Sequence, residues 1–219
     1  MYHYEYVSRE EAAPYRAKLL EIIHKVQDLV RDQFTFQFQF VGSAKRNMIT
    51  YDPTTKKGFD FDVNIAVNDD DENYSPDEIR SILFNALQTV SRQYGYTRCE
   101  QSTRVITMKR IDYLGTRIEN SCDFAIVYQG GKRQQYIRYN KLSGSFSWEY
   151  QRQTTGELEA RAEALKQDSR LWNEVREVYL YKKNSNQDAN KRSLSLYAEA
   201  VNECYRRYIK RQHDEAHVN

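Results

Sequence analysis

Residues 40–67, FVGSAKRNMITYDPTTKKGFDFDVNIAV, decide the fold of this chain. The apolar run from Gly58 to Val67 predicts a β-strand that carries two aspartates, Asp60 and Asp62, two positions apart. Side chains at positions i and i+2 of a strand point to the same face, with about 7 Å between their backbone positions. Two carboxylates on one face repel each other, and either a proton or a bound divalent cation removes the repulsion. The pattern therefore indicates a metal site or, more simply, a solvent-facing strand edge.

Asp123 offers a third carboxylate. It comes directly before the alternating strand residues Phe124 to Val127, a place where an acidic side chain gains nothing from packing. If this strand lies beside the strand over 58–67, its carboxylate completes the cluster. Three carboxylates suit a site for two metal ions about 3.5–4 Å apart, each with oxygen ligands. The acidic run Asp69–Glu72 is instead predicted to be a solvated loop before a helix.

A Gly-Ser pair, Gly42 and Ser43, closes the Phe-rich stretch 33–41. Glycine permits close backbone approach, and the serine hydroxyl with backbone N–H groups can contact a phosphate. Lys45 and Arg46 follow, and they could contact phosphate or simply be solvated. Together with the carboxylates, these residues describe a triphosphate held on metal ions.

Periodicity predicts the remaining elements. Strands are expected over 33–41, 58–67, 103–112, 119–128 and 134–150, the last of them bent or split at 142–145. Helices are expected over 15–30, 75–95, most of 157–183, and 193–212, and a hairpin turn is expected over 129–132. Ser8 with Glu11 offers a capping box, and Ser75 with Glu78 offers another.

The order of these elements predicts an α+β fold in two parts. A catalytic core with an N-terminal helix is expected over 1–155, and a C-terminal helical lobe over 156–219. The formal net charge of +2 gives no nucleic-acid signal over the whole chain. Apolar runs of only a few residues and three widely spaced cysteines favour a cytoplasmic protein with no membrane partner and no disulfide framework.

A Gly-Ser pair after a strand, the segment Asp60-Phe61-Asp62-Val63 and a later aspartate on another strand resemble the polymerase-β-type nucleotidyltransferase superfamily. With a long preceding helix and the sequence VNI after the second aspartate, the pattern is most similar to the branch of oligoadenylate synthetases and cyclic-dinucleotide synthases. The resemblance covers about residues 15–150. It implies a mixed β-sheet flanked by helices, dependence on Mg²⁺ or Mn²⁺, and attack on the α-phosphorus of a nucleoside triphosphate.

The resemblance also implies roles for individual residues. Gly42 and Ser43 would hold the β- and γ-phosphates, Asp60 and Asp62 would ligate both metal ions, and Asp123 would join the ion that activates the nucleophile.

Lys191 and Arg192, just ahead of the helix that Ser193 is expected to cap, stand where the helical lobe of the family often reaches the triphosphate, and Lys191 and Ser193 are expected to contact the nucleotide. The polar segment 182–192 is equally well interpreted as a flexible linker. Basic and aromatic residues mingle between Phe124 and Trp148, where they could stack a base or simply belong to the sheet.

The leading hypothesis is a metal-dependent nucleotidyltransferase that uses an NTP, with ATP or GTP expected first, and releases pyrophosphate. Its acceptor could be a nucleotide, an RNA, a small molecule or a protein, because the same three carboxylates suit all of them. The alternative hypotheses are a non-catalytic nucleotide-binding or toxin–antitoxin partner module with the same fold, and a plain structural protein.

Overall fold

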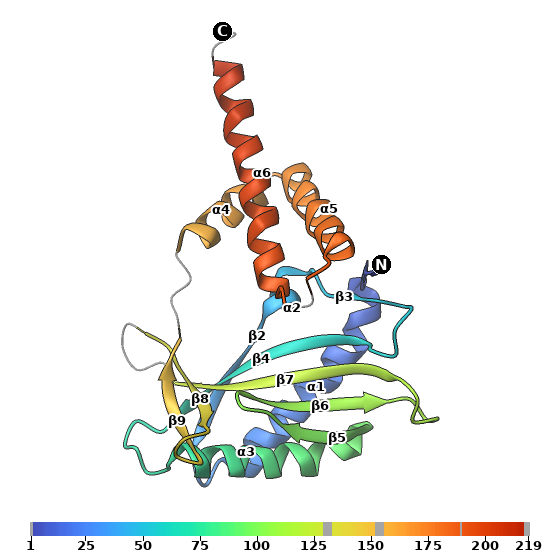
Figure 1. The fold of residues 1–219 in the computed structure, drawn as a ribbon. Helices are drawn as coiled ribbons and strands as arrows, with labels where there is room; N and C mark the ends of the chain where they lie inside the picture. Colours follow the sequence, from blue (N-terminus) through green and yellow to red (C-terminus); the bar gives the residue numbers. More distant parts are fainter. Residues whose placement is uncertain (1, 129–132, 152–155, 189, 217–219) are drawn as a thin grey trace. The chain divides into compact units, whose positions relative to one another are not determined.

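The computed structural model describes residues 2–128, 133–151, 156–188 and 190–216 (Figure 1). Its elements are, in order, β1 (Glu5–Tyr6), α1 (Arg9–Val30), β2 (Thr35–Val41), α2 (Gly42–Arg46), β3 (Thr50–Tyr51), β4 (Phe59–Asn68), α3 (Pro76–Ser91), the 3₁₀ helix η1 (Arg92–Tyr94), β5 (Tyr96–Gln101), β6 (Val105–Ile111), β7 (Ile118–Tyr128), β8 (Gln135–Asn140), β9 (Ser145–Tyr150), α4 (Gly156–Lys166), α5 (Ser169–Ser185) and α6 (Ser193–Ala216). They divide into two compact units, residues 6–151 and residues 1–5 with 152–219.

The unit of residues 6–151 is built on one mixed β-sheet. Its strand order is β2-β4-β7-β6-β5, and β8 pairs with β7 and then with β9. The central strands β4 and β7 run parallel, whereas β2 is antiparallel to β4 and β6 is antiparallel to β7. The α+β class with a mixed sheet and C-terminal helices, as predicted, is confirmed.

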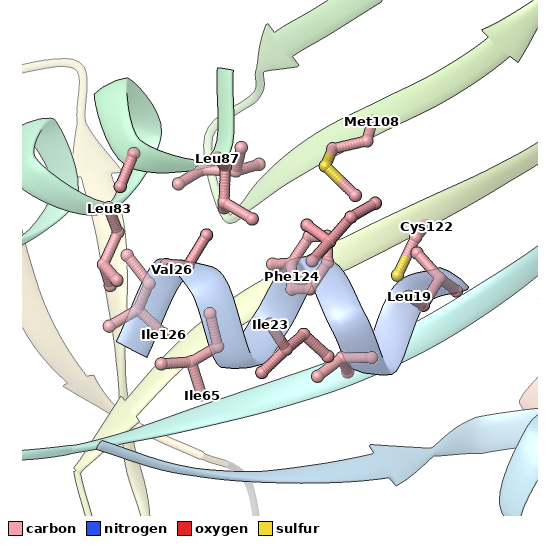
Figure 2. Packing of buried hydrophobic residues seen from close by; sticks show 14 of the residues in the cluster. Leu19, Ile23, Val26, Ile65, Leu83, Leu87, Met108, Cys122, Phe124 and Ile126 are labelled. Carbon is pink, nitrogen blue, oxygen red and sulfur yellow. The ribbon is translucent and has the colours of Figure 1, made fainter. Parts of the chain in front are cut away.

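Helices α1 and α3 cover one face of this sheet, and the hydrophobic core lies between them and the strands (Figure 2). The strands contribute side chains at alternate positions, namely Phe61, Val63, Ile65 and Val67 from β4 and Cys122, Phe124 and Ile126 from β7. Figure 2 shows Leu19, Ile23 and Val26 of α1 packed among them. Because strand side chains alternate, burying this set turns the intervening residues of β4 and β7 to the opposite face.

The start of α1 and the presence of β5 differ from the prediction. Helix α1 begins at Arg9 and not near 15, because the predicted capping box of Ser8 and Glu11 is formed and the helix accommodates Pro14. Strand β5 has no counterpart in the predicted set, since its residues are mostly exposed and carry little alternation. The second predicted capping box, formed by Ser75 and Glu78, is confirmed at the start of α3. The turn predicted over 129–132 lies outside the described residues.

Arg80 of α3 is a charged side chain that is only 1% exposed. Its Nη2 donates to the carbonyl oxygens of Ser102 (2.7 Å) and Val105 (2.9 Å), and its Nε donates to Gln101 Oε1 (3.0 Å). Its guanidinium lies 4.3 Å from the centre of the Phe146 ring. Burial lowers the pKa of Arg80 to about 10. The side chain therefore joins α3 to the β5–β6 turn and to β9.

We expect Arg80→Met to lower the free energy of unfolding by about 3 kcal/mol, because it removes the hydrogen bonds that the buried guanidinium donates to Gln101, Ser102 and Val105. Urea denaturation followed by circular dichroism measures the change. Arg98→Met, at an exposed position of β5, is the matched control and should change stability by less than about 0.5 kcal/mol. Equal, small effects of both substitutions would contradict the role given to Arg80.

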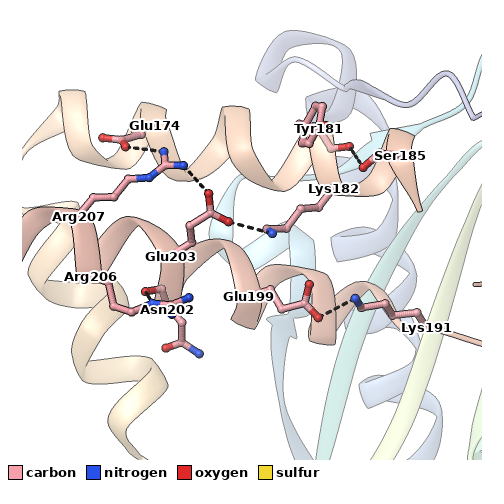
Figure 3. A network of polar contacts seen from close by, with 10 residues as sticks. All are labelled: Glu174, Tyr181, Lys182, Ser185, Lys191, Glu199, Asn202, Glu203, Arg206 and Arg207. Carbon is pink, nitrogen blue, oxygen red and sulfur yellow. Dashed lines mark hydrogen bonds and ion pairs between the residues drawn. The ribbon is translucent and has the colours of Figure 1, made fainter. Parts of the chain in front are cut away.

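The second unit is helical, and α4, α5 and α6 pack on a core of their own. The buried residues are Ala162, Leu165, Val175, Tyr179, Leu196, Tyr197, Ala200, Val201 and Cys204. Ion pairs join α5 to α6, with Lys182 Nζ 2.9 Å from Glu203 Oε2 and Arg207 Nη1 3.1 Å from Glu174 Oε1 (Figure 3). Within the described ranges, no helix combines the length and apolar character that crossing a bilayer requires.

Candidate active site

Three carboxylates lie on the sheet face opposite α1 and α3. In the parallel register of β4 and β7, Asp62 stands beside Asp123 and Asp60 stands beside Ser121. Since registered residues of neighbouring strands point to the same side, Asp60, Asp62 and Asp123 share one face. Asp123 occupies the middle of β7 and not a strand start, because β7 already begins at Ile118. The sheet register therefore brings Asp123 next to the two aspartates of β4.

The electrostatics of Asp62 and Asp123 reflect their proximity. Burial, and then the charges of Asp123 and Asp60, raise the pKa of Asp62 to about 6, while Arg46 opposes the shift. Burial also raises the pKa of Asp123, and the charge of Asp60 adds to it. A hydrogen bond from Thr107 acts in the opposite direction on Asp123. Ionising both carboxylates in the absence of a cation therefore costs free energy.

Gly42 lies directly against Asp62. Its φ of +61° is in the left-handed region that favours glycine, and a Cβ added there would lie 2.3 Å from Asp62 Oδ2. The register explains this approach, because Val41, the last residue of β2, pairs with Asp62. The sequence predicts that the Gly-Ser pair closes the Phe-rich strand, and in the structure Gly42 follows β2 directly as the first residue of the short helix α2. Both backbone conformation and space require glycine at this position.

The residues after Gly42 form the rest of α2. The carbonyl oxygen of Ser43 accepts a hydrogen bond from the Met48 N–H (2.9 Å), and Asn47 ends the helix with a left-handed φ of 56°. Arg46 is half-buried and close enough to Asp62 to affect its pKa, whereas Lys45 is exposed. Of the predicted phosphate-binding residues in this segment, Arg46 is thus near the carboxylates and Lys45 faces solvent.

Sequence reasoning missed two hydroxyl side chains at the site, Thr107 and Ser121. Thr107 of β6 is the register partner of Asp123, and its Oγ1 donates to Asp123 Oδ1 (2.6 Å). The Ser121 hydroxyl donates to Asp60 Oδ1. Ser121 carries a usable signal, because it stands two positions before Asp123 as Asp60 stands two positions before Asp62. Thr107 carries none, since only strand pairing places it beside Asp123.

The three carboxylates are the candidate ligands for a divalent cation. Among the residues that the structure describes, no group of three or more His, Cys, Asp or Glu side chains is arranged as a ready metal site. The chemistry of the carboxylates nevertheless fits, because Asp60, Asp62 and Asp123 supply hard oxygen donors on one face and their charges raise the pKa of Asp62. The register of β4 and β7 sets the backbone positions from which the three side chains reach this face.

A cavity of about 180 Å³ lies on the same sheet face, next to the carboxylates. Its floor includes Asn64 and Ala125, which follow Asp62 and Asp123 by two positions and are register partners of each other. Its other lining residues are Arg104, Val105, Val127, Gln134, Tyr136 and Gln151. The Arg104 guanidinium lies 5.1 Å from the centre of the Tyr136 ring. Amide, cationic and aromatic groups thus surround a space beside the carboxylates.

The two remaining predicted residues belong to the helical unit. Lys191 Nζ lies 2.7 Å from Glu199 Oε1 (Figure 3), and Ser193 is the first residue of α6. Their contact with a nucleotide stays a prediction.

No protein-family model and no curated protein sequence matches the chain. Solved structures do match its fold. The cyclic AMP-GMP synthase DncV of Vibrio cholerae, in complex with the linear intermediate 5′ pppA(3′,5′)pG, has a TM-score of 0.64 and 11% identity over 91% of this chain and 68% of its own. The CD-NTase CdnG of Bradyrhizobium diazoefficiens, in complex with GTP, has a TM-score of 0.57 and 10% identity over 90% of this chain and 66% of its own.

A third structure, Escherichia coli DncV bound to 3′-deoxy GTP, has a TM-score of 0.54 and 17% identity over 91% of this chain and 54% of its own. The chain therefore spans from about half to about two thirds of the lengths of these synthases. At such identities the likeness concerns the fold. It confirms, at that level, the predicted polymerase-β-type nucleotidyltransferase fold in the form that cyclic-dinucleotide synthases have.

Proposed function

We propose that this protein is a metal-dependent nucleotidyltransferase that transfers a nucleotidyl group from an NTP to an acceptor and releases pyrophosphate. The observation that carries the proposal is the register of β4 and β7, which sets Asp62 beside Asp123 with Asp60 on the same face. The fold shared with the CD-NTase CdnG, whose structure contains GTP, supports it. A solvent-facing strand edge would not carry carboxylates like Asp62 and Asp123, whose pKa values are raised by burial and then by the charge of a neighbouring carboxylate.

The reaction is a substitution at phosphorus. An acceptor oxygen forms a bond to the α-phosphorus of the NTP, the bond from that phosphorus to the bridging β-oxygen breaks, and pyrophosphate leaves with the electron pair. When the acceptor is a hydroxyl, its proton goes to solvent water. Bound Mg²⁺ or Mn²⁺ would supply the positive charge that offsets the negative charge on the attacking and leaving oxygens.

The residues of this chain have separate roles in that reaction. Asp60 and Asp62 would hold the cations, and Asp123 would join the one that activates the acceptor. Gly42 lets the backbone of α2 come close to Asp62, and the Ser43 hydroxyl and the adjacent N–H groups bind the β- and γ-phosphates. Arg46, which is close to Asp62, and Lys45 are assigned as further contacts to the triphosphate.

We assign the cavity lined by Asn64 and Ala125 as the binding site of the acceptor. Its lining residues Asn64 and Ala125 follow Asp62 and Asp123 by two positions, so the cavity lies on the face to which their carboxylates point. An aromatic ring at Tyr136 and a guanidinium at Arg104 suit a planar, hydrogen-bonding group. The acceptor oxygen would then lie on the Asp123 side of the site.

The test is pyrophosphate release from ATP, GTP, CTP and UTP with Mg²⁺ or Mn²⁺, with products separated by mass. We expect release with at least one NTP, its complete loss in excess EDTA, and its recovery when Mg²⁺ is restored. The Asp60→Ala/Asp62→Ala double variant is the inactive control, and product mass identifies the acceptor. NTP-induced thermal stabilisation without release, in every combination of two NTPs, would favour the non-catalytic binding module instead.

A further inference from the structure

Each of the three carboxylates is restrained by a different neighbour. The Ser121 hydroxyl donates to Oδ1 of Asp60, the Thr107 hydroxyl donates to Oδ1 of Asp123, and the Gly42 backbone lies against Oδ2 of Asp62. Two of these neighbours come from the sheet itself. One oxygen of Asp60 and one oxygen of Asp123 are therefore engaged by hydroxyl donors, whereas Asp62 is in close contact with Gly42.

The contact between Thr107 and Asp123 is a consequence of strand pairing. Asp62, Asp123 and Thr107 form one row across β4, β7 and β6, because Asp62 pairs with Asp123 and Asp123 pairs with Thr107. Side chains directly opposite each other on one face come within about 4.5–5.5 Å at Cβ. The hydroxyl of a threonine at this position spans that gap with a hydrogen bond of 2.6 Å.

We propose that Thr107 is a positioning residue for the metal site: its hydroxyl holds Asp123 by one oxygen and thereby directs the other oxygen toward the cation. Ser121 holds Asp60 in the same way from the next row of the sheet. Neither hydroxyl contacts the substrate or the cation. This inference rests on the proposed metal-dependent function and adds the residues that orient its ligands.

The physical reason is that Asp123 is partly buried and lies near other carboxylates. A carboxylate in such a place rotates away from its neighbours or takes up a proton, unless a donor fixes it. Threonine is well suited to be that donor, because its branched Cβ limits rotation about χ1 and so fixes the hydroxyl relative to β6. Valine has nearly the same shape and no donor, so it removes the hydrogen bond while it preserves the packing.

The experiment measures Mn²⁺ binding to the intact chain by isothermal titration calorimetry, with Mn²⁺ alone as the probe. We expect Thr107→Val to weaken Mn²⁺ binding about tenfold, within the range seen when partners of metal ligands are removed. Thr107→Ser, which keeps the hydroxyl, should bind within about threefold of wild type. Thr97→Val, the same change at an exposed position of β5, should bind like wild type.

The outcomes distinguish failure of the metal-dependent function from failure of the positioning role of Thr107. If wild type binds Mn²⁺ no better than the Asp60→Ala/Asp62→Ala variant, the metal-dependent function itself is wrong and the positioning role falls with it. If wild type binds Mn²⁺ through the aspartates while Thr107→Val binds equally well, only the positioning role is overturned. Thermal denaturation checks that each variant is folded. Should Thr107→Val not fold, Thr107→Ala replaces it, and equal binding by the alanine and serine variants overturns the proposal.

Discussion

Asp62→Asn is expected to reduce pyrophosphate release about 1,000-fold or more. The substitution removes a negative charge and an oxygen donor from the centre of the cluster, between Asp60 and Asp123. A catalytic metal ion contributes several kcal/mol of transition-state stabilisation, and each 1.36 kcal/mol corresponds to a tenfold change in rate. Steady-state release of pyrophosphate, at saturating NTP and Mg²⁺, measures the effect.

The same substitution should make the protein more stable in the absence of divalent cations. In the folded protein the pKa of Asp62 is raised to about 6, above its ordinary value of 3.8. Well below pH 3.8 the carboxyl is neutral in both the folded and the unfolded state, so its ionisation does not lower the free energy of unfolding. As pH rises from there through 6, ionisation increasingly favours the unfolded state. We therefore expect Asp62→Asn to raise the free energy of unfolding by about 2 kcal/mol at pH 7.5 and to leave it unchanged at pH 3.5.

Urea denaturation in EDTA at the two pH values measures this gain. Asp71→Asn, in the exposed loop before α3, is the matched control and should change neither stability nor activity. Mg²⁺ should stabilise wild type and have much less effect on Asp62→Asn, because a cation offsets the repulsion that the substitution has already removed. An Asp62→Asn protein that is as active as wild type would refute the assignment of the site.

Gly42→Ala is expected to lower pyrophosphate release about 100-fold with only moderate loss of stability. The added Cβ would lie 2.3 Å from Asp62 Oδ2, so either the carboxylate or the start of α2 has to move. A displacement of about 1 Å in a catalytic group can cost about 100-fold in rate. The left-handed φ of +61° adds backbone strain of about 1–2 kcal/mol.

A matched control separates the displacement of Asp62 from the backbone strain. Gly115, in the β6–β7 turn, has nearly the same φ, +70°, and no atom within 4 Å of an added Cβ. Gly115→Ala should therefore lose a similar free energy of unfolding and keep full activity. If Gly42→Ala and Gly115→Ala retained equal activity, the close approach of Gly42 to Asp62 would have no catalytic importance.

Local sequence was sufficient for the elements whose signals are local. The capping box of Ser75 and Glu78 starts α3 where it was expected, because both partners lie within one helical turn. The alternation of apolar and polar residues in β4 likewise settles which face carries Asp60 and Asp62, since burying Phe61 on one side turns its neighbours to the other. These features depend on residues only a few positions apart.

Local sequence was insufficient to predict the secondary structure in three places. Strand β5 is mostly exposed and lacks alternation, so pairing with β6 decides its conformation. The predicted elements include no helix after Gly42, where the structure has the short helix α2, which ends at Asn47 in a left-handed conformation. Helix α1 extends past Pro14 to Arg9, because the capping box at Ser8 outweighs the hydrogen bond that proline lacks.

The sequence by itself determined that this chain carries a pair of carboxylates on one face of a strand, with a Gly-Ser pair before it and a third aspartate far along the chain. Only the tertiary structure decided that Asp123 stands beside Asp62, that Gly42 lies against Asp62 and that Thr107 donates to Asp123. The reason is that strand register is fixed by the burial of whole strands against α1 and α3. Contacts across 16 or 61 positions of sequence follow from that register and leave no local pattern.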